Sequence, residues 1–166
     1  MKKYLILILV FAFIISVTAP TQALVEPDVN EGHGHFLVNL VVPRVDSGFA
    51  VAGDYGINNN FGIFGEIGDP FSRLGLKYQL SPGFAVTGGY VVNNSIFIGL
   101  NTSLAAADNL RISGDFGLVA PDSDLALMYE AGAIYELPEN IDVRASVSGI
   151  TSKIDIKYKL GFGYSF

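Results

Sequence analysis

The last thirteen residues of the chain alternate between apolar side chains and polar or small ones without a break. Every even position from Ile154 to Phe166 is apolar, and the odd positions between them hold Asp, Lys, Gly and Ser. A period of two places successive side chains on opposite faces of an extended strand. The pattern therefore predicts a β-strand with one apolar face, which ends the chain on an aromatic residue.

Similar alternation recurs through most of the chain, and segments rich in Asn, Asp, Gly, Pro and Ser, which favour turns, separate the runs. Ten strands are expected, at about 35–43, 49–57, 61–68, 72–80, 84–92, 95–104, 110–119, 125–137, 141–149 and 154–166. The fold class is therefore all-β, an antiparallel up-and-down barrel. Eight strands are the alternative if the weakest runs, 35–43 and 61–68, fail to pair.

The first 23 residues have a different pattern. Lys2 and Lys3 precede an apolar run over residues 4–17, and the segment ends in Thr21-Gln22-Ala23. This is the pattern of a cleavable secretory signal peptide, and the apolar run is short for a helix that spans a membrane. Cleavage after Ala23 would leave 8 basic and 16 acidic side chains, a formal charge of −8.

Residues 24–34 are acidic and contain Pro27 and two glycines. They are expected to form a flexible periplasmic lead-in to a barrel that occupies residues 35–166.

Each expected strand can be phased so that one face carries no charged residue, and the charges then share the opposite face. The remainder of that charged face is mostly Gly, Ala, Ser, Thr, Asn and Gln, which suits the inside of a narrow barrel in which charges pair. The predicted charge network of the lumen consists of Asp54, Glu66, Arg73, Lys77, Arg111, Asp115, Glu130, Glu136, Asp142, Arg144, Asp155, Lys157 and Lys159.

Parity alone does not say which face points outward, so a soluble periplasmic or secreted barrel that binds an apolar ligand is the alternative. The charged face has too many small residues to solubilise a surface, and the apolar face is too bulky for a small lumen. Aromatic side chains also gather beside every second turn, as they do in the belts at membrane interfaces. The predicted belt consists of Tyr55, Phe61, Tyr78, Phe84 and Tyr135. A transmembrane barrel is therefore favoured.

Composition agrees with this interpretation. Only 16% of the residues are charged, whereas soluble domains have about 25%. The formal net charge of −6 disfavours nucleic acid as a partner, because phosphates call for a basic patch. The chain has no cysteine, which excludes disulfides and thiolate metal sites.

The strand lengths, the even strand number, the tight turns and the final aromatic strand resemble the small outer-membrane β-barrel proteins of Gram-negative-type bacteria. That resemblance implies contact with outer-membrane lipid, periplasmic termini, and biogenesis by periplasmic chaperones and the barrel-assembly machinery. It also implies an assembly signal in the last strand, at Tyr158, Leu160, Phe162, Tyr164 and Phe166. The chain departs from the family in lacking long external loops.

Catalysis has little support in the sequence. The only histidines, His33 and His35, lie at the start of the first expected strand. With Glu31 nearby they are a weak candidate for metal binding, because two ligands and a flexible acid make a poor site. We expect no enzymatic activity and no cofactor. The predicted function is a structural barrel or a narrow channel for ions or small solutes, of undetermined oligomeric state.

Overall fold

The computed structural model describes residues 26–42, 48–68, 72–92, 95–120, 125–151 and 155–166. The expected signal peptide, residues 1–23, lies outside them. The strands are β1 (Gly34–Val42), β2 (Gly48–Gly56), β3 (Phe61–Gly68), β4 (Arg73–Ser81), β5 (Phe84–Val91), β6 (Ser95–Ala107), β7 (Leu110–Val119), β8 (Ala126–Glu136), β9 (Ile141–Ile150) and β10 (Asp155–Ser165). Among these residues no helix has the length and apolar character needed to cross a membrane.

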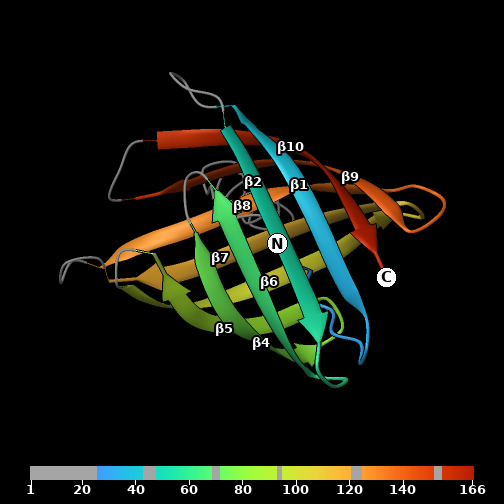
Figure 1. The fold of residues 1–166 in the computed structure, drawn as a ribbon, viewed down its shortest axis with the longest axis horizontal. Coiled ribbons are helices and arrows are strands. Elements are labelled where there is room, and N and C mark those ends of the chain that lie inside the picture. Colours follow the sequence, from blue (N-terminus) through green and yellow to red (C-terminus); the bar gives the residue numbers. More distant parts are fainter. Residues whose placement is uncertain (1–25, 43–47, 69–71, 93–94, 121–124, 152–154) are drawn as a thin grey trace, which may run out of the picture.

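The ten strands form one closed antiparallel barrel, in which each strand pairs with its neighbours in the chain (Figure 1). The last strand closes on the first, with His35 opposite Ser165 and Val42 opposite Tyr158. The prediction of ten strands is confirmed. The eight-stranded alternative is wrong, because β1 and β3, the two weakest runs, both pair on both sides.

We call the end of the barrel where β1 begins and β10 ends the terminal end, and the opposite end the far end. The described hairpin turns between β2 and β3, β4 and β5, β6 and β7, and β8 and β9 all lie at the terminal end. These turns are short. In the turn after β4, Gly83 has a φ of 72°, a conformation that glycine adopts without steric cost.

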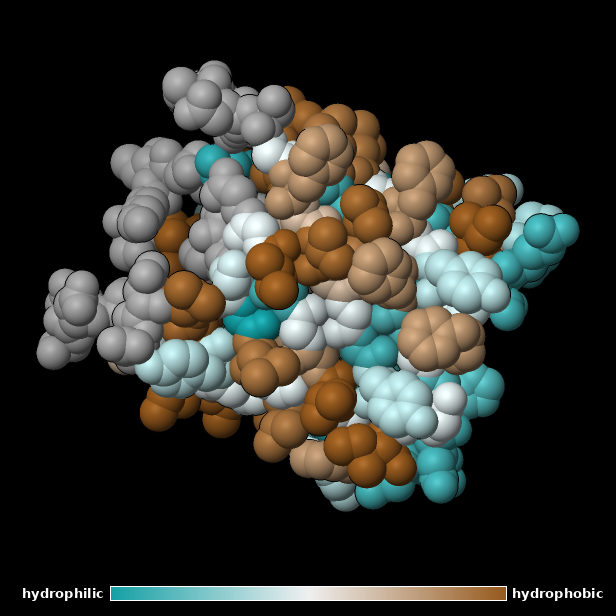
Figure 2. Space-filling model, viewed as in Figure 1, coloured by the Kyte–Doolittle hydropathy of each residue, from teal (hydrophilic) through white to brown (hydrophobic). Residues whose placement is uncertain are grey.

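Side chains alternate between the two faces of the wall, as the period of two predicts. In β10, Lys157 and Lys159 are buried in the barrel, whereas Tyr158 and Leu160 point outward and are 59% and 57% exposed. Figure 2 shows apolar residues spread over the wall and hydrophilic ones gathered at the terminal end. Such a wide apolar surface is abnormal for a soluble protein and normal for a wall that faces lipid.

Candidate functional site

The lumen contains three groups of side chains that succeed one another along the strands. Along β7 they are represented by Val119, then Asp115, then Arg111, going from the far end to the terminal end. The apolar group consists of Phe64, Val91, Phe97, Val119, Ala126, Met128 and Ile150. The central ion group consists of Glu66, Arg73, Asp115, Glu130 and Lys159. The mouth group consists of Glu26, His35, Asp54, Lys77, Arg111, Glu136, Asp142 and Arg144.

The apolar group corrects the expectation that the charged face holds otherwise mostly small residues. Phe64 and Phe97 meet edge to face, with ring centroids 6.1 Å apart. The ring of Phe64 fits because Gly75 lies opposite it in β4, where a Cβ atom would come within 2.7 Å of the ring. Strand alternation places both rings on the same face as the charges, and the expectation of a face of small residues did not include aromatic side chains there.

The central ion group forms a continuous chain of ion pairs across the lumen. The guanidinium of Arg73 lies 2.8 Å from an oxygen of Asp115 and 3.3 Å from one of Glu66. The ammonium of Lys159 lies 3.0 Å from Glu66 and 3.3 Å from Glu130, and Glu130 also accepts a hydrogen bond from the Ser146 hydroxyl. Each charge thus has a partner of opposite sign, as burial in a medium of low dielectric requires.

Arg73 also joins the central ion group to the apolar group. Its guanidinium carbon lies 4.9 Å from the ring centroid of Phe64 and 5.8 Å from that of Phe97. Both distances are within the range of cation–π attraction. The two groups therefore pack directly on each other and leave no gap between them at this point.

The mouth group lies at the terminal end. The ammonium of Lys77 is 3.0 Å from Asp54. The Nη2 atom of Arg144 lies 3.0 Å from Asp142 and 2.8 Å from Nε2 of His35. The same Nε2 atom lies 2.9 Å from Oδ2 of Asp142, so it stands between a guanidinium that only donates and a carboxylate that only accepts.

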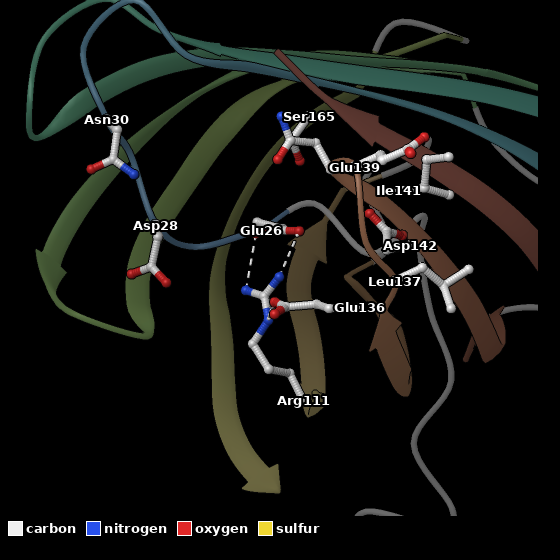
Figure 3. Close-up of a pocket in the computed structure, with 11 residues that line it drawn as sticks. Glu26, Asp28, Asn30, Arg111, Glu136, Leu137, Glu139, Ile141, Asp142 and Ser165 are labelled. Carbon is white, nitrogen blue, oxygen red and sulfur yellow. Dashed lines mark hydrogen bonds and ion pairs between the residues drawn. The ribbon is translucent and has the colours of Figure 1, made fainter. Parts of the chain in front are cut away.

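Glu26 belongs to the mouth group although it precedes the barrel (Figure 3). Its two carboxylate oxygens lie 2.9 and 3.0 Å from the terminal nitrogens of Arg111, and one of them is 2.7 Å from Arg144. Burial alone would raise the pKa of the Glu26 carboxyl, but the two arginines outweigh it and hold that pKa below its ordinary value.

The lead-in is irregular up to β1, but its described part is docked on the barrel mouth. Asp28 accepts hydrogen bonds from Gln79 Nε2 at 2.9 Å and from the backbone N–H of Gly83 at 2.8 Å. Val29 is 3% exposed, and its N–H donates to Gln79 Oε1. The expectation of a flexible segment missed these contacts. The sequence does contain one indication of this docking. Two acids, Glu26 and Asp28, directly precede a barrel that is expected to hold cations in its lumen.

The remaining predicted residues occupy the following positions. Lys157 is buried, Glu136 pairs with Arg111 at the rim, and the side chain of Asp155 lies outside the described residues. The predicted belt residues lie at the terminal end of the outer face, where Phe61 is directly opposite Tyr78. The predicted assembly-signal residues are all exposed on the outer face of β10 or just after it.

The predicted metal pair does not form. His33 is exposed, whereas His35 is buried among the mouth group. Among the described residues, Glu26, His35 and Asp142 do bring three possible ligand atoms within 4.8 Å of one another. Their centre is already taken by a cation, since Nη2 of Arg144 is 2.7 to 3.0 Å from all three. The residues therefore fit a guanidinium better than a metal ion.

The described part of the lumen is packed at its centre and at the far end, where the side chains are almost inaccessible to water. The five side chains of the central ion group are 1 to 3% exposed, and Phe97 and Met128 of the apolar group are 2% and 0% exposed. A cavity of about 500 Å³ opens at the mouth, beside Glu26, Arg111 and Glu136. It borders the mouth group, whose contacts with the lead-in close the lumen on that side.

A closed ten-stranded antiparallel barrel with an apolar wall and a charged, packed lumen defines a small β-barrel of the outer-membrane class. No family model matches the sequence, and no curated protein matches it.

This chain is similar to several solved structures. The KdgM porin has a TM-score of 0.52 and 13% sequence identity, over 80% of this chain and 99% of that one. Ail from Yersinia pestis, in a phospholipid bilayer nanodisc, has a TM-score of 0.47 and 17% identity, over 82% and 100% of the two chains. Omp33 from Acinetobacter baumannii has a TM-score of 0.48 and 10% identity, over 82% and 99%. At these identities the likeness to KdgM concerns the fold alone.

Proposed function

We propose that the protein is a small barrel of the bacterial outer membrane whose lumen is sealed, so that it acts as a structural element of the envelope. One observation carries this proposal. The central ion group spans the lumen with side chains that are 1 to 3% exposed, whereas the lining of an open channel must be wet. Apolar side chains pack on the same group from the far end and exclude a bypass there.

The outward apolar face argues against the soluble carrier of an apolar ligand. Leu74 and Phe162 are each 67% exposed on the wall, while the lumen is filled by ion pairs. Such a surface would aggregate in water but dissolve in a bilayer. Among the described residues, the larger apolar cluster of the lumen lies at the far end and is already packed.

The finer cellular assignments are part of the same proposal. Residues 1–23 act as a signal peptide, the terminal end faces the periplasm, and chaperones and the barrel-assembly machinery deliver the chain to lipid. Two observations support these assignments. The lead-in and Phe166 lie at the same end of the barrel. The aromatic residues of β10 are exposed, so the assembly machinery could bind them. No enzymatic role is proposed, because none of the hydrogen bonds described joins His35 to a serine or threonine hydroxyl.

The proposal is tested by single-channel recording in a planar bilayer that contains the protein. Insertion is verified separately, by protection of the strands from protease in vesicles of the same lipid. A sealed barrel gives no stable conductance steps when inserted. Stable steps from the wild-type protein would contradict the seal.

A narrow channel for ions or small solutes is the second candidate, because the mouth and the centre of the lumen are lined by charges rather than by apolar residues alone. This candidate predicts steps whose ion selectivity changes in the Arg111→Glu variant. Arg111 is the appropriate position because its side chain is 20% exposed at the mouth and would face entering ions.

A further inference from the structure

The terminal mouth presents a set of hydrogen-bond donors that converge on one short stretch of chain. The donors are the guanidinium groups of Arg111 and Arg144, the ammonium of Lys77, the side-chain amide of Gln79 and the backbone N–H of Gly83. They come from β4, the turn after it, β7 and β9, and β4 and β9 lie on opposite sides of the ring of strands, so the donors approach the mouth from two sides.

The stretch that they bind is Glu26-Pro27-Asp28. The Glu26 carboxylate is held by two arginines, and that of Asp28 by Gln79 and Gly83. Lys77 donates hydrogen bonds to the backbone of the same stretch. Its Nζ atom lies 2.8 Å from the carbonyl oxygen of Glu26 and 3.4 Å from that of Asp28.

The site also covers much of this stretch, and it leaves Glu26 and Asp28 half-buried. Pro27 is buried, and Val29 after it is 3% exposed. Lys77 and Arg144 are buried as well, at 1% and 2%. Charge-assisted hydrogen bonds to buried donors are among the stronger polar contacts in proteins, and a planar guanidinium suits a carboxylate especially well.

We propose that the terminal mouth is a binding site for an acidic peptide of the form Glu-x-Asp, and that the chain's own Glu26-Pro27-Asp28 occupies it as an internal ligand. A tethered ligand competes at an effective concentration in the millimolar range. The site is therefore filled in the intact chain, and an external peptide gains access only when the internal acids are removed. The proposal concerns the mouth alone and holds whether or not the lumen conducts.

The test uses the full chain in detergent micelles and a fluorescent peptide that copies residues 24–31, LVEPDVNE. Its binding by fluorescence anisotropy is compared between the wild-type protein and the double variant Glu26→Ala, Asp28→Ala. The peptide is expected to bind the variant at least tenfold more tightly, because the internal competitor has lost its acids. Equal binding to both proteins would overturn the proposal.

Two controls make the result specific. The peptide LVQPNVNE has the same length but neither acid at these positions, and it is expected to bind the double variant at least tenfold more weakly. Adding Arg111→Gln to the double variant should remove most of the gained affinity. Equal affinities for the two peptides would also overturn the proposal. Circular dichroism checks that each barrel is folded, and Glu26→Gln alone replaces the double variant if that one does not fold.

Discussion

The ring of Phe166, the last residue of the chain, lies over Gly34, the first residue of β1. Two backbone hydrogen bonds join them, from Gly34 N to Phe166 O at 3.0 Å and from Phe166 N to Gly34 O at 2.9 Å. A Cβ atom at position 34 would come within 2.5 Å of the ring. A side chain at position 34 would therefore require the Phe166 ring at the end of the seam to shift.

Replacing Gly34 by leucine should therefore destabilise the closed barrel by about 1–3 kcal/mol, since added atoms must displace the ring or the strand. Urea titration of the barrel in lipid vesicles, followed by circular dichroism, measures the change. The cause is checked by a double-mutant cycle with Phe166→Ala, which removes the ring. A coupling of about 0.5 kcal/mol or more is expected for residues in contact, whereas additive effects would show that the ring is not what position 34 accommodates.

Position along the wall should decide the cost of a charge on the outer face. Leu100 lies opposite Val86 and Phe116 near the middle of β6, and Leu104 lies nearer the terminal end. Leu100→Arg should cost about 2–4 kcal/mol in lipid and Leu104→Arg about 0–1 kcal/mol, because the penalty falls toward the interface. Folding titrations in the same vesicles measure both. Equal costs for arginine at the two positions would contradict the claim that Leu100 lies near the middle of the bilayer and Leu104 near its surface.

Breaking the central ion group should be costly. In Arg73→Leu the carboxylates of Glu66 and Asp115 lose a shared cation inside the barrel, and a loss of about 3–5 kcal/mol of stability is expected. Adding Asp115→Asn should recover part of it by removing one uncompensated charge. Both variants are compared by urea titration. A cost below about 1 kcal/mol for the single change is typical of an exposed ion pair and would contradict the buried network.

Acid should release the docked lead-in. The pKa of Glu26 is lowered in the docked state, against burial, mainly by Arg144 and Arg111. Its ionised form therefore stabilises docking above the ordinary carboxyl pKa of about 4.3, and this contribution is lost as the pH falls through the lowered pKa. A spin label at Glu31→Cys should become more mobile over that range in electron paramagnetic resonance spectra. The Glu26→Gln variant should lack this response, and an identical response in both proteins would exclude Glu26 as its source.

The sequence predicts the wall of this barrel well, because a period of two has one structural meaning over ten strands. Strand number and pairing order follow from that pattern. The outward face follows from the bulk of the apolar side chains and from the small residues on the opposite face. The sequence also predicts which charged side chains point into the lumen. Each charged side chain that the structure describes in a strand lies on the face opposite to the apolar one.

Two features could not be read from the pattern. The inward direction of Phe64 and Phe97 follows from strand parity, but the space for their rings comes from glycines opposite or beside them. Such pairing between strands depends on register rather than on local periodicity. Docking of the lead-in joins Glu26 to Arg111, which is 85 positions away. Glu26 lies in no periodic element, so only the tertiary structure shows that its carboxylate completes the mouth.

The sealed lumen is tested most directly by the accessibility of one buried serine. Ser148 is 0% exposed at the inner face of β9, and the chain has no cysteine of its own, so Ser148→Cys introduces a single, nearly isosteric thiol. The reference is Asp108→Cys, at an exposed turn of the terminal end. With both proteins inserted in vesicles, a water-soluble thiol reagent should modify position 148 at least about 100-fold more slowly than position 108, because only opening of the barrel exposes it. Equal rates at the two positions would contradict the sealed lumen and indicate a water-filled channel.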